Sequence, residues 1–210
     1  MNILDVLIVL CVIVFSMVLH ELAHGVVALA LGDTTAKEDG RLTLNPIKHL
    51  DPVMSVVLPL ISYLMGGVVF GGAKPVPVNT HRLKWGVWGM ALVAIAGPLT
   101  NFLLAFVSFL IIELTGISDH GGIIYTILLE VMLVNLGFGV FNLIPIPPLD
   151  GSRVLYALMP DGVRELMTKM EPVGIYIVYV LILVGGGIFS SIMLGAMNGI
   201  VQGFYWIIGK

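Results

Sequence analysis

Residues 3–31 read ILDVLIVLCVIVFSMVLHELAHGVVALAL, an apolar run with two histidines and a glutamate near its end. The run is longer than the ~20 residues that an α-helix needs to cross a bilayer. It lacks a basic start and no A-x-A cleavage site follows it, so we expect a retained helix rather than a signal peptide. Ionisable residues inside such a helix are costly and functional by default. The stretch therefore predicts a membrane protein with a site inside the membrane.

The composition of the whole chain agrees with this interpretation. Of its 210 residues, 58% are hydrophobic and 11% are charged, against about 25% charged residues in soluble proteins. This excludes an ordinary soluble domain and a disordered tail. The net charge of −3, with scattered basic residues, excludes a nucleic-acid binder that works through a basic face. The single cysteine, Cys11, cannot form an intramolecular disulfide.

Further apolar stretches predict a mainly α-helical, polytopic bundle of roughly 4–6 spans. We expect one membrane-embedded domain over residues 1–210, with a core at 1–150 and C-terminal amphipathic and transmembrane segments at 151–210. The stretches that follow the first are Val53–Phe70, Trp85–Ile112, Ile123–Ile144, Val173–Leu194 and the shorter Met197–Ile208.

A small insert of strands and a re-entrant loop is expected between the first and third apolar stretches. Thr34–Asn45 contains Asp-Gly before an alternating segment, which favours a short hairpin. Residues 73–79 (AKPVPVN) alternate too, and their prolines suit an edge strand. Val53–Phe70 contains a proline and ends near paired glycines, so it favours a re-entrant path over a plain span.

The distribution of basic residues supports the re-entrant path. If Val53–Phe70 enters and leaves by one face, the basic residues around it gather on one side and join those after residue 150, while the loop at 113–122 carries none. The positive-inside rule then places that side in the cytoplasm and the N-terminus outside. These basic residues are Lys37, Arg41, Lys48, Lys74, Arg82, Lys84, Arg153, Arg164 and Lys169.

The motif His20-Glu21-x-x-His24 predicts a metal site within the first helix. Residues four apart differ by about 40° around a helix and about 6 Å along it, so both imidazoles can reach one tetrahedral zinc ion. Glu21 projects beside the open position, where it can take a proton from water. Structural histidines paired with a glutamate are the alternative, but the bilayer makes it unfavourable. A charge there costs about 2.5–3.5 kcal/mol, whereas a structural zinc site can return roughly 10–16 kcal/mol.

A third ligand has several candidates in the sequence. Glu130 lies mid-span, whereas Asp150 follows the fourth stretch and a proline-rich run, NLIPIPPLDG at 142–151. A re-entrant second stretch makes the first and fourth helices parallel, which brings Asp150 to the membrane face of the histidines. An ordinary capping role for Asp150 remains the alternative. The other candidates lie in or near loops: His49, Asp51, His81 and His120.

Taken together, these motifs resemble the site-2 protease family of intramembrane zinc metalloproteases. The resemblance rests on His20-Glu21-x-x-His24, on Gly97-Pro98-x-x-Asn101 and on Leu149-Asp150-Gly151. Residues 41–52 (RLTLNPIKHLDP) and 73–79 are similar to the short prokaryotic members, which lack PDZ and CBS domains.

The resemblance implies a zinc-dependent endopeptidase that cuts transmembrane segments of membrane proteins. His20, His24 and Asp150 would hold one zinc ion, and Glu21 would be the general base. A bilayer, a transmembrane protein substrate and no nucleic acid are the expected partners, and a prokaryotic cell membrane, with the active site toward the cytoplasm, is the expected location.

Two asparagines are further candidates. Asn101 and Asn142 could donate hydrogen bonds to an oxyanion or to substrate, or could instead satisfy carbonyls freed beside prolines. A membrane zinc carrier, with Glu130 continuing a polar path, is the rival function, although paired half-domains are not visible. An inactive relative that shelters transmembrane helices is a second rival, and the intact Glu21 argues against it.

Overall fold

The computed structural model describes residues 3–50, 74–119 and 121–210 of the chain. It is mainly α-helical, and it has no strand among these residues. The helices, in chain order, are α1 (Ile3–Ala30), α2 (Thr35–Glu38), the 3-10 helix η1 (Pro46–His49), α4 (Val87–Thr115), the 3-10 helix η3 (Ile117–Asp119), α5 (Ile123–Asn142), α6 (Asp150–Leu158) and α7 (Asp161–Ile207).

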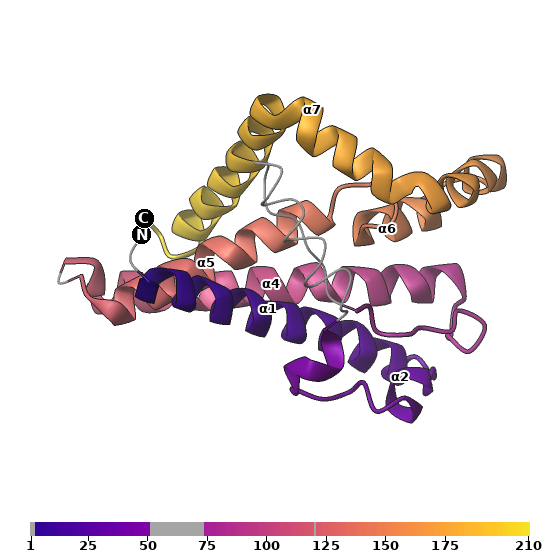
Figure 1. Ribbon diagram of the computed structural model, residues 1–210, viewed down its shortest axis with the longest axis horizontal. Helices are drawn as coiled ribbons and strands as arrows, with labels where there is room; N and C mark the ends of the chain where they lie inside the picture. The colour runs from indigo at the N-terminus through magenta and orange to yellow at the C-terminus, as the bar shows by residue number, and fades with distance from the viewer. Residues whose placement is uncertain (1–2, 51–73, 120) are drawn as a thin grey trace.

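Four helices in the described part of the chain are long and apolar enough to cross a bilayer. They are α1, α4, α5 and the Gly186–Ile207 part of α7, which agrees with the predicted polytopic bundle. The last two apolar stretches, expected as separate pieces, belong to one continuous helix, and Figure 1 shows that α7 bends sharply between its ends. Val53–Phe70 and its predicted re-entrant path lie outside the described residues.

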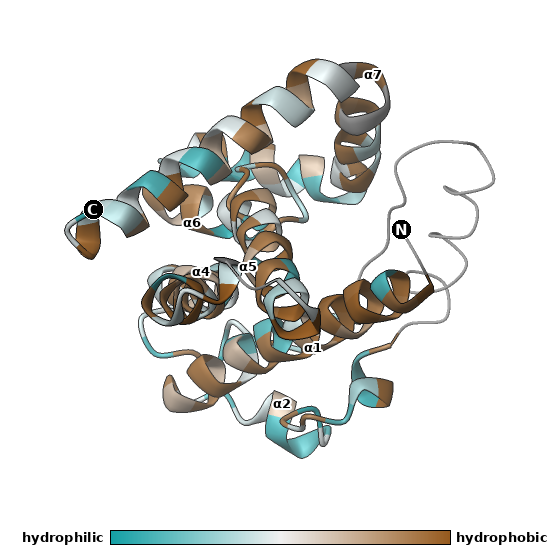
Figure 2. Cartoon of the chain, turned by 90° about the vertical axis from the view of Figure 1, so that its left-hand side faces the viewer, coloured by the Kyte–Doolittle hydropathy of each residue, from teal (hydrophilic) through white to brown (hydrophobic). Residues whose placement is uncertain are grey.

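The helices α1, α4 and α5 pack against one another and form the centre of the molecule. Figure 1 shows that α4 runs antiparallel to the other two, so α1 and α5 are parallel as the sequence predicts. Near one end, Phe109 of α4, Leu136 of α5 and Phe204 of α7 form a buried cluster. The outward-facing sides of α1 and α4 are largely apolar (Figure 2), as lipid-facing surfaces should be.

The chain leaves α1 and enters α4 at the same end of the bundle. The N–H of Lys84 donates to the carbonyl of Leu31 at 2.8 Å, and Leu31 and Leu83 lie in a buried cluster with Ala28 of α1 and Val93 of α4. The segment between α1 and α4 therefore makes no net crossing. This is the premise on which the sequence places Asp150 beside the histidines.

The predicted hairpin at Thr34–Asn45 is wrong. Thr35–Glu38 is the helix α2, and the backbone N–H of Thr35 donates to the Asp33 carboxylate at its start. The Asn45 side chain accepts from the N–H of Ile47 and so begins η1, with Pro46 in the first turn. Local helix-start signals outweigh the short alternation between them.

The predicted edge strand at 73–79 is also wrong in its described part, 74–79. This segment bonds to loops and side chains instead of to a neighbouring strand. The N–H of Lys74 donates to the His49 carbonyl at 2.8 Å, and Arg41 donates to the carbonyls of Lys74 and Pro75. Prolines 75 and 77 have no backbone N–H to donate, and the N–H of Val76 between them donates to the Glu21 side chain instead of to a neighbouring strand.

Asp33 fastens the far end of residues 74–79 to the end of α1. Its side chain is fully buried and accepts from the N–H of Thr35 at 3.0 Å and from the N–H of Asn79 at 2.6 Å. Burial opposes its ionisation, but the hydrogen bonds from Thr35 and Asn79 and the charge of Arg82 outweigh burial. The pKa of Asp33 therefore lies below its ordinary value.

We predict that Asp33→Asn destabilises the protein at pH 7 by roughly 1–3 kcal/mol, because an amide cannot accept both N–H groups as the carboxylate does. A lowered pKa stabilises the fold above the unfolded-state pKa of about 4, and this contribution is lost as the pH falls through the lower, folded-state pKa. Unfolding in detergent at pH 7 and near pH 3 should thus show a gap between wild type and variant that narrows in acid. An equal gap at both pH values would contradict the assignment.

Candidate metal centre

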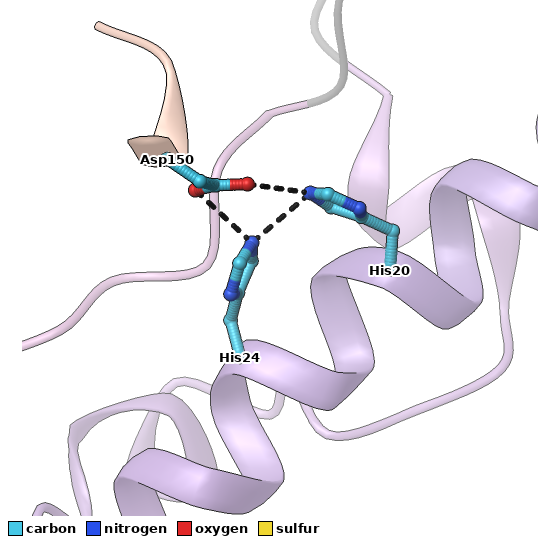
Figure 3. A group of neighbouring side chains, drawn as sticks. All are labelled: His20, His24 and Asp150. Carbon is cyan, nitrogen blue, oxygen red and sulfur yellow. Dashed lines mark hydrogen bonds and ion pairs between the residues drawn. The ribbon is translucent and has the colours of Figure 1, made fainter. Parts of the chain in front are cut away.

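Three side chains from α1 and α6 converge on one point (Figure 3). His20 Nε2 lies 3.1 Å from Asp150 Oδ2, and His24 Nε2 lies 3.4 Å from Asp150 Oδ1. The two Nε2 atoms lie 3.0 Å apart. Among the described residues, the group of three or more ligating side chains that could hold a metal consists of His20, His24 and Asp150, whose ligand atoms all lie within 4.8 Å of one another.

The absence of a side chain on Gly97 of α4 makes room for both imidazoles. A Cβ at Gly97 would lie 2.5 Å from His20 Cε1 and 2.6 Å from His24 Cε1, distances that no Cβ can tolerate. The ring of each histidine is therefore pressed against the α4 backbone. Packing of α1 on α4 thus fixes the direction in which the two imidazoles point.

Close backbone contacts place Asp150 at the start of α6. A Cβ at Gly151 would lie 2.1 Å from the Leu143 carbonyl oxygen, so only glycine lets α6 begin so near the end of α5. On the other side, Gly174 of α7 lies directly against the Pro147 carbonyl. The proline-rich run is held between α5 and α7, and the carboxylate of Asp150 is held toward α1.

The second nitrogen of each histidine faces a hydrogen-bond acceptor. His24 Nδ1 lies 2.8 Å from the Val93 carbonyl oxygen, and His20 Nδ1 lies 2.6 Å from Asn101 Oδ1. Each neutral ring must carry its proton on Nδ1, so each Nε2 presents a lone pair.

The arrangement suits a bound cation. Two Nε2 lone pairs and a carboxylate face one another, and the buried Asp150 Oδ2 has no hydrogen-bond donor among the described residues. Zinc bound tetrahedrally at about 2.0–2.1 Å would place its ligand atoms about 3.4 Å apart, close to the spacing observed. Both histidines are buried. The two-histidine, one-carboxylate set fits zinc and leaves a coordination position open.

Glu21 is held by the segment at 74–79. Its Oε2 accepts the N–H of Val76 at 2.8 Å, so a residue far along the chain orients this carboxylate. Glu21 is predictable from the sequence, but its contact with Val76 is not, because nothing in a Pro-Val-Pro segment indicates that the central N–H binds a carboxylate.

The two predicted asparagines have different surroundings. Asn101 is fully buried, and its amide nitrogen donates to Asn135 Oδ1 at 2.7 Å while its oxygen faces His20. This favours a role in positioning the ring over contact with an oxyanion. Asn142 donates to the Phe138 carbonyl at 3.0 Å, and its predicted contact with substrate stays a prediction.

Other polar residues lie away from the three ligands. Glu130 is half-buried within α5 and is outside the metal-ligating group. His49 is buried, and its Nε2 lies 2.8 Å from the Thr43 carbonyl oxygen, where it holds a turn. Asn135 and Ser16 were not predicted as site residues, although each is a polar residue inside an apolar stretch of the sequence.

Comparisons with known proteins point to one family. The model of peptidase family M50 matches residues 116–185. "Putative zinc metalloprotease YwhC" of Bacillus subtilis (strain 168) is 41% identical over 182 residues, covering 80% of this chain and 77% of that protein. "Putative zinc metalloprotease Rip2" of Mycolicibacterium smegmatis is 31% identical over 172 residues, covering 80% of this chain and 63% of that one.

Among solved structures, a site-2 protease from Methanocaldococcus jannaschii matches with a TM-score of 0.45 and 25% identity, over 92% of this chain and 76% of that one. The match to the B. subtilis protein spans most of both chains. The chain therefore belongs to peptidase family M50, the site-2 proteases, and is a zinc metalloprotease.

Proposed function

We propose that this chain hydrolyses peptide bonds in or next to transmembrane segments of other membrane proteins. In this proposal one zinc ion is held by His20, His24 and Asp150, and Glu21 is the general base. The observation that carries the proposal is the convergence of two imidazole lone pairs and a carboxylate, with ligand atoms within 4.8 Å of one another, in a chain with four apolar helices.

The residues around the centre suit hydrolysis. Zinc, when bound, acidifies a water molecule and polarises a carbonyl group. Glu21 takes the proton of the attacking water and passes it to the leaving amine. The hydrogen bond from Val76 holds the Glu21 carboxylate in one orientation, which reduces the reorganisation needed for proton transfer.

The substrate must reach a site that lies within the apolar helices. Asp150 keeps 19% of its side-chain surface exposed, so the proposed centre is not fully enclosed. A peptide bond in a helix is sheltered by its own hydrogen bonds, so the substrate has to unwind locally before attack. A membrane-embedded protein with a helix that unwinds easily is therefore the favoured class of substrate.

The basic residues favour a cytoplasmic position for the metal end of the bundle. The C-terminal end of α1, the N-terminal end of α4 and α6 lie at one end of the molecule (Figure 1). The basic residues in the connections around them outnumber those at the other end, where Lys210 pairs with Glu113 of α4. By the positive-inside rule this end lies in the cytoplasm of a prokaryotic cell.

Glu21→Gln should lower cleavage of a tagged single-span reporter protein by roughly 10²–10⁴-fold, because the amide cannot accept the proton. Zinc content, measured on the same purified protein, should stay at the wild-type value, since Glu21 is not a ligand. Equal cleavage by wild type and variant would end the general-base assignment.

Gly97→Ala should weaken zinc binding without changing a ligand, because the added Cβ would overlap both imidazoles. The matched control is Gly137→Ala in α5, where a Cβ meets nothing within 4 Å. Zinc bound after dialysis against a chelator is the measurement. The proposed centre would be contradicted if both variants kept the same zinc as wild type.

The orientation can be tested with single cysteines. In a Cys11→Ser background, Ser118→Cys marks the end near η3 and Lys84→Cys marks the end near the metal centre; both positions are exposed. A membrane-impermeant thiol reagent should label Ser118→Cys in intact spheroplasts and Lys84→Cys only after lysis. The opposite labelling would reverse the proposed topology.

A further inference from the structure

A chain of hydrogen bonds connects three helices behind His20. Asn135 of α5 donates to Ser16 Oγ of α1 at 2.8 Å and accepts from Asn101 Nδ2 of α4 at 2.7 Å. Asn101 Oδ1 then faces His20 Nδ1 at 2.6 Å. Asn101 and Asn135 are both fully buried. These contacts lie on the side of the imidazole away from the metal centre.

The direction of this chain is set at Asn135. Its amide nitrogen has two hydrogens, and these go to Ser16 Oγ and to the Val131 carbonyl oxygen, each at 2.8 Å. A carbonyl oxygen can only accept, so the NH₂ group of Asn135 must face Val131. Its Oδ1 is thereby turned toward α4, where it can only accept from Asn101.

The orientation of Asn135 sets that of Asn101, and Asn101 in turn sets the proton position on His20. Because Asn135 offers an acceptor, Asn101 presents its NH₂ group to Asn135 and its oxygen to His20. An oxygen there keeps the proton of His20 on Nδ1, and Nε2 is left with the lone pair that binds a metal. If the Asn101 amide were flipped, its NH₂ would face Nδ1, and the proton would sit on Nε2 and block the ligand position.

We infer that Asn135 is a positioning residue for metal binding, because it fixes the tautomer of His20 through Asn101. His24 has no need of such a relay, since the Val93 carbonyl faces its Nδ1 directly. A backbone carbonyl therefore sets the proton position of each imidazole. The Val93 carbonyl acts directly on His24. The Val131 carbonyl acts on His20 through the side chains of Asn135 and Asn101. The inference rests on the proposal that His20 is a zinc ligand.

Asn135→Leu tests the relay, because leucine fills a similar volume and offers no acceptor to Asn101. The zinc dissociation constant of the full chain in detergent, measured by competition with a chelator, should rise roughly 10-fold, at the low end of the effect of outer-shell substitutions. The d–d absorption of the Co²⁺-substituted protein should change as well, since His20 would leave the ion in part of the molecules. An unchanged dissociation constant would overturn the inference.

A rescue variant separates the tautomer from simple packing. In Asn101→Asp combined with Asn135→Leu, an ionised carboxylate can only accept from His20 Nδ1, whatever lies behind it, so zinc affinity should recover toward wild type. A merely structural role for Asn135 predicts the reverse, because the double variant adds a buried charge. A double variant that binds zinc no better than Asn135→Leu would overturn the inference.

The matched control is Thr100→Val. Thr100 of α4 donates to the carbonyl four residues earlier, that of Ala96, at 2.9 Å, but it is not connected to His20. Its loss should leave the zinc dissociation constant within about 2-fold of wild type, since it removes a helix-backbone contact alone. A shift as large as that of Asn135→Leu would show that any lost polar contact weakens the site.

Should Asn135→Leu fail to fold, Asn135→Asp decides the question. Aspartate has nearly the shape of asparagine and still offers an acceptor to Asn101, so zinc affinity should be kept even if stability falls; its loss would overturn the inference. Wild-type protein that binds no zinc would instead overturn the proposed function, so the two failures are distinguishable.

Discussion

The meeting of Asp150 with the imidazoles of His20 and His24 is the constraint on which the rest of the structure depends. Two imidazole nitrogens and a carboxylate come within bonding distance of one another, an approach that is favourable when a proton or a metal ion lies between them. Bringing them together requires α1 and α5 to be parallel, the chain to return between α1 and α4, and α6 to start immediately after the prolines. Each of these features is needed to bring the Asp150 carboxylate close to the two imidazoles.

The helix α4 supplies most of the control over the site, although it contributes no ligand. The Val93 carbonyl accepts from His24 Nδ1, and the Asn101 side-chain oxygen accepts from His20 Nδ1. Gly97 lies between these two residues, and its missing side chain leaves room for both rings. The proposed ligands lie on α1 and α6, so the groups that would bind the metal and the groups that orient them belong to different helices. The proposed general base, Glu21, has a separate support in the N–H of Val76, which donates to its carboxylate.

Much of this could be predicted from the sequence, because its signals are local or follow from the membrane. The spacing of His20 and His24 is a property of any helix, the parity of spans favoured Asp150 over Glu130, and the resemblance to the site-2 proteases completed the predicted ligand set. The hairpin at Thr34–Asn45 was wrong because the hydrogen bond from Thr35 to Asp33 and the capping of η1 by Asn45 favour helical turns over four alternating residues. The relay through Asn135 could not be predicted, since it depends on how three helices rotate against one another.

The dependence of both imidazoles on α4 has a consequence for how this protein can change over evolutionary time. Adding or deleting one residue between Val93 and Asn101 would turn one contact about 100° around the helix and move it about 1.5 Å relative to the other. One histidine would then lose its partner whatever residues were chosen. Length variation among natural descendants should therefore be confined to the connections, and this stretch of α4 should diverge by substitution alone.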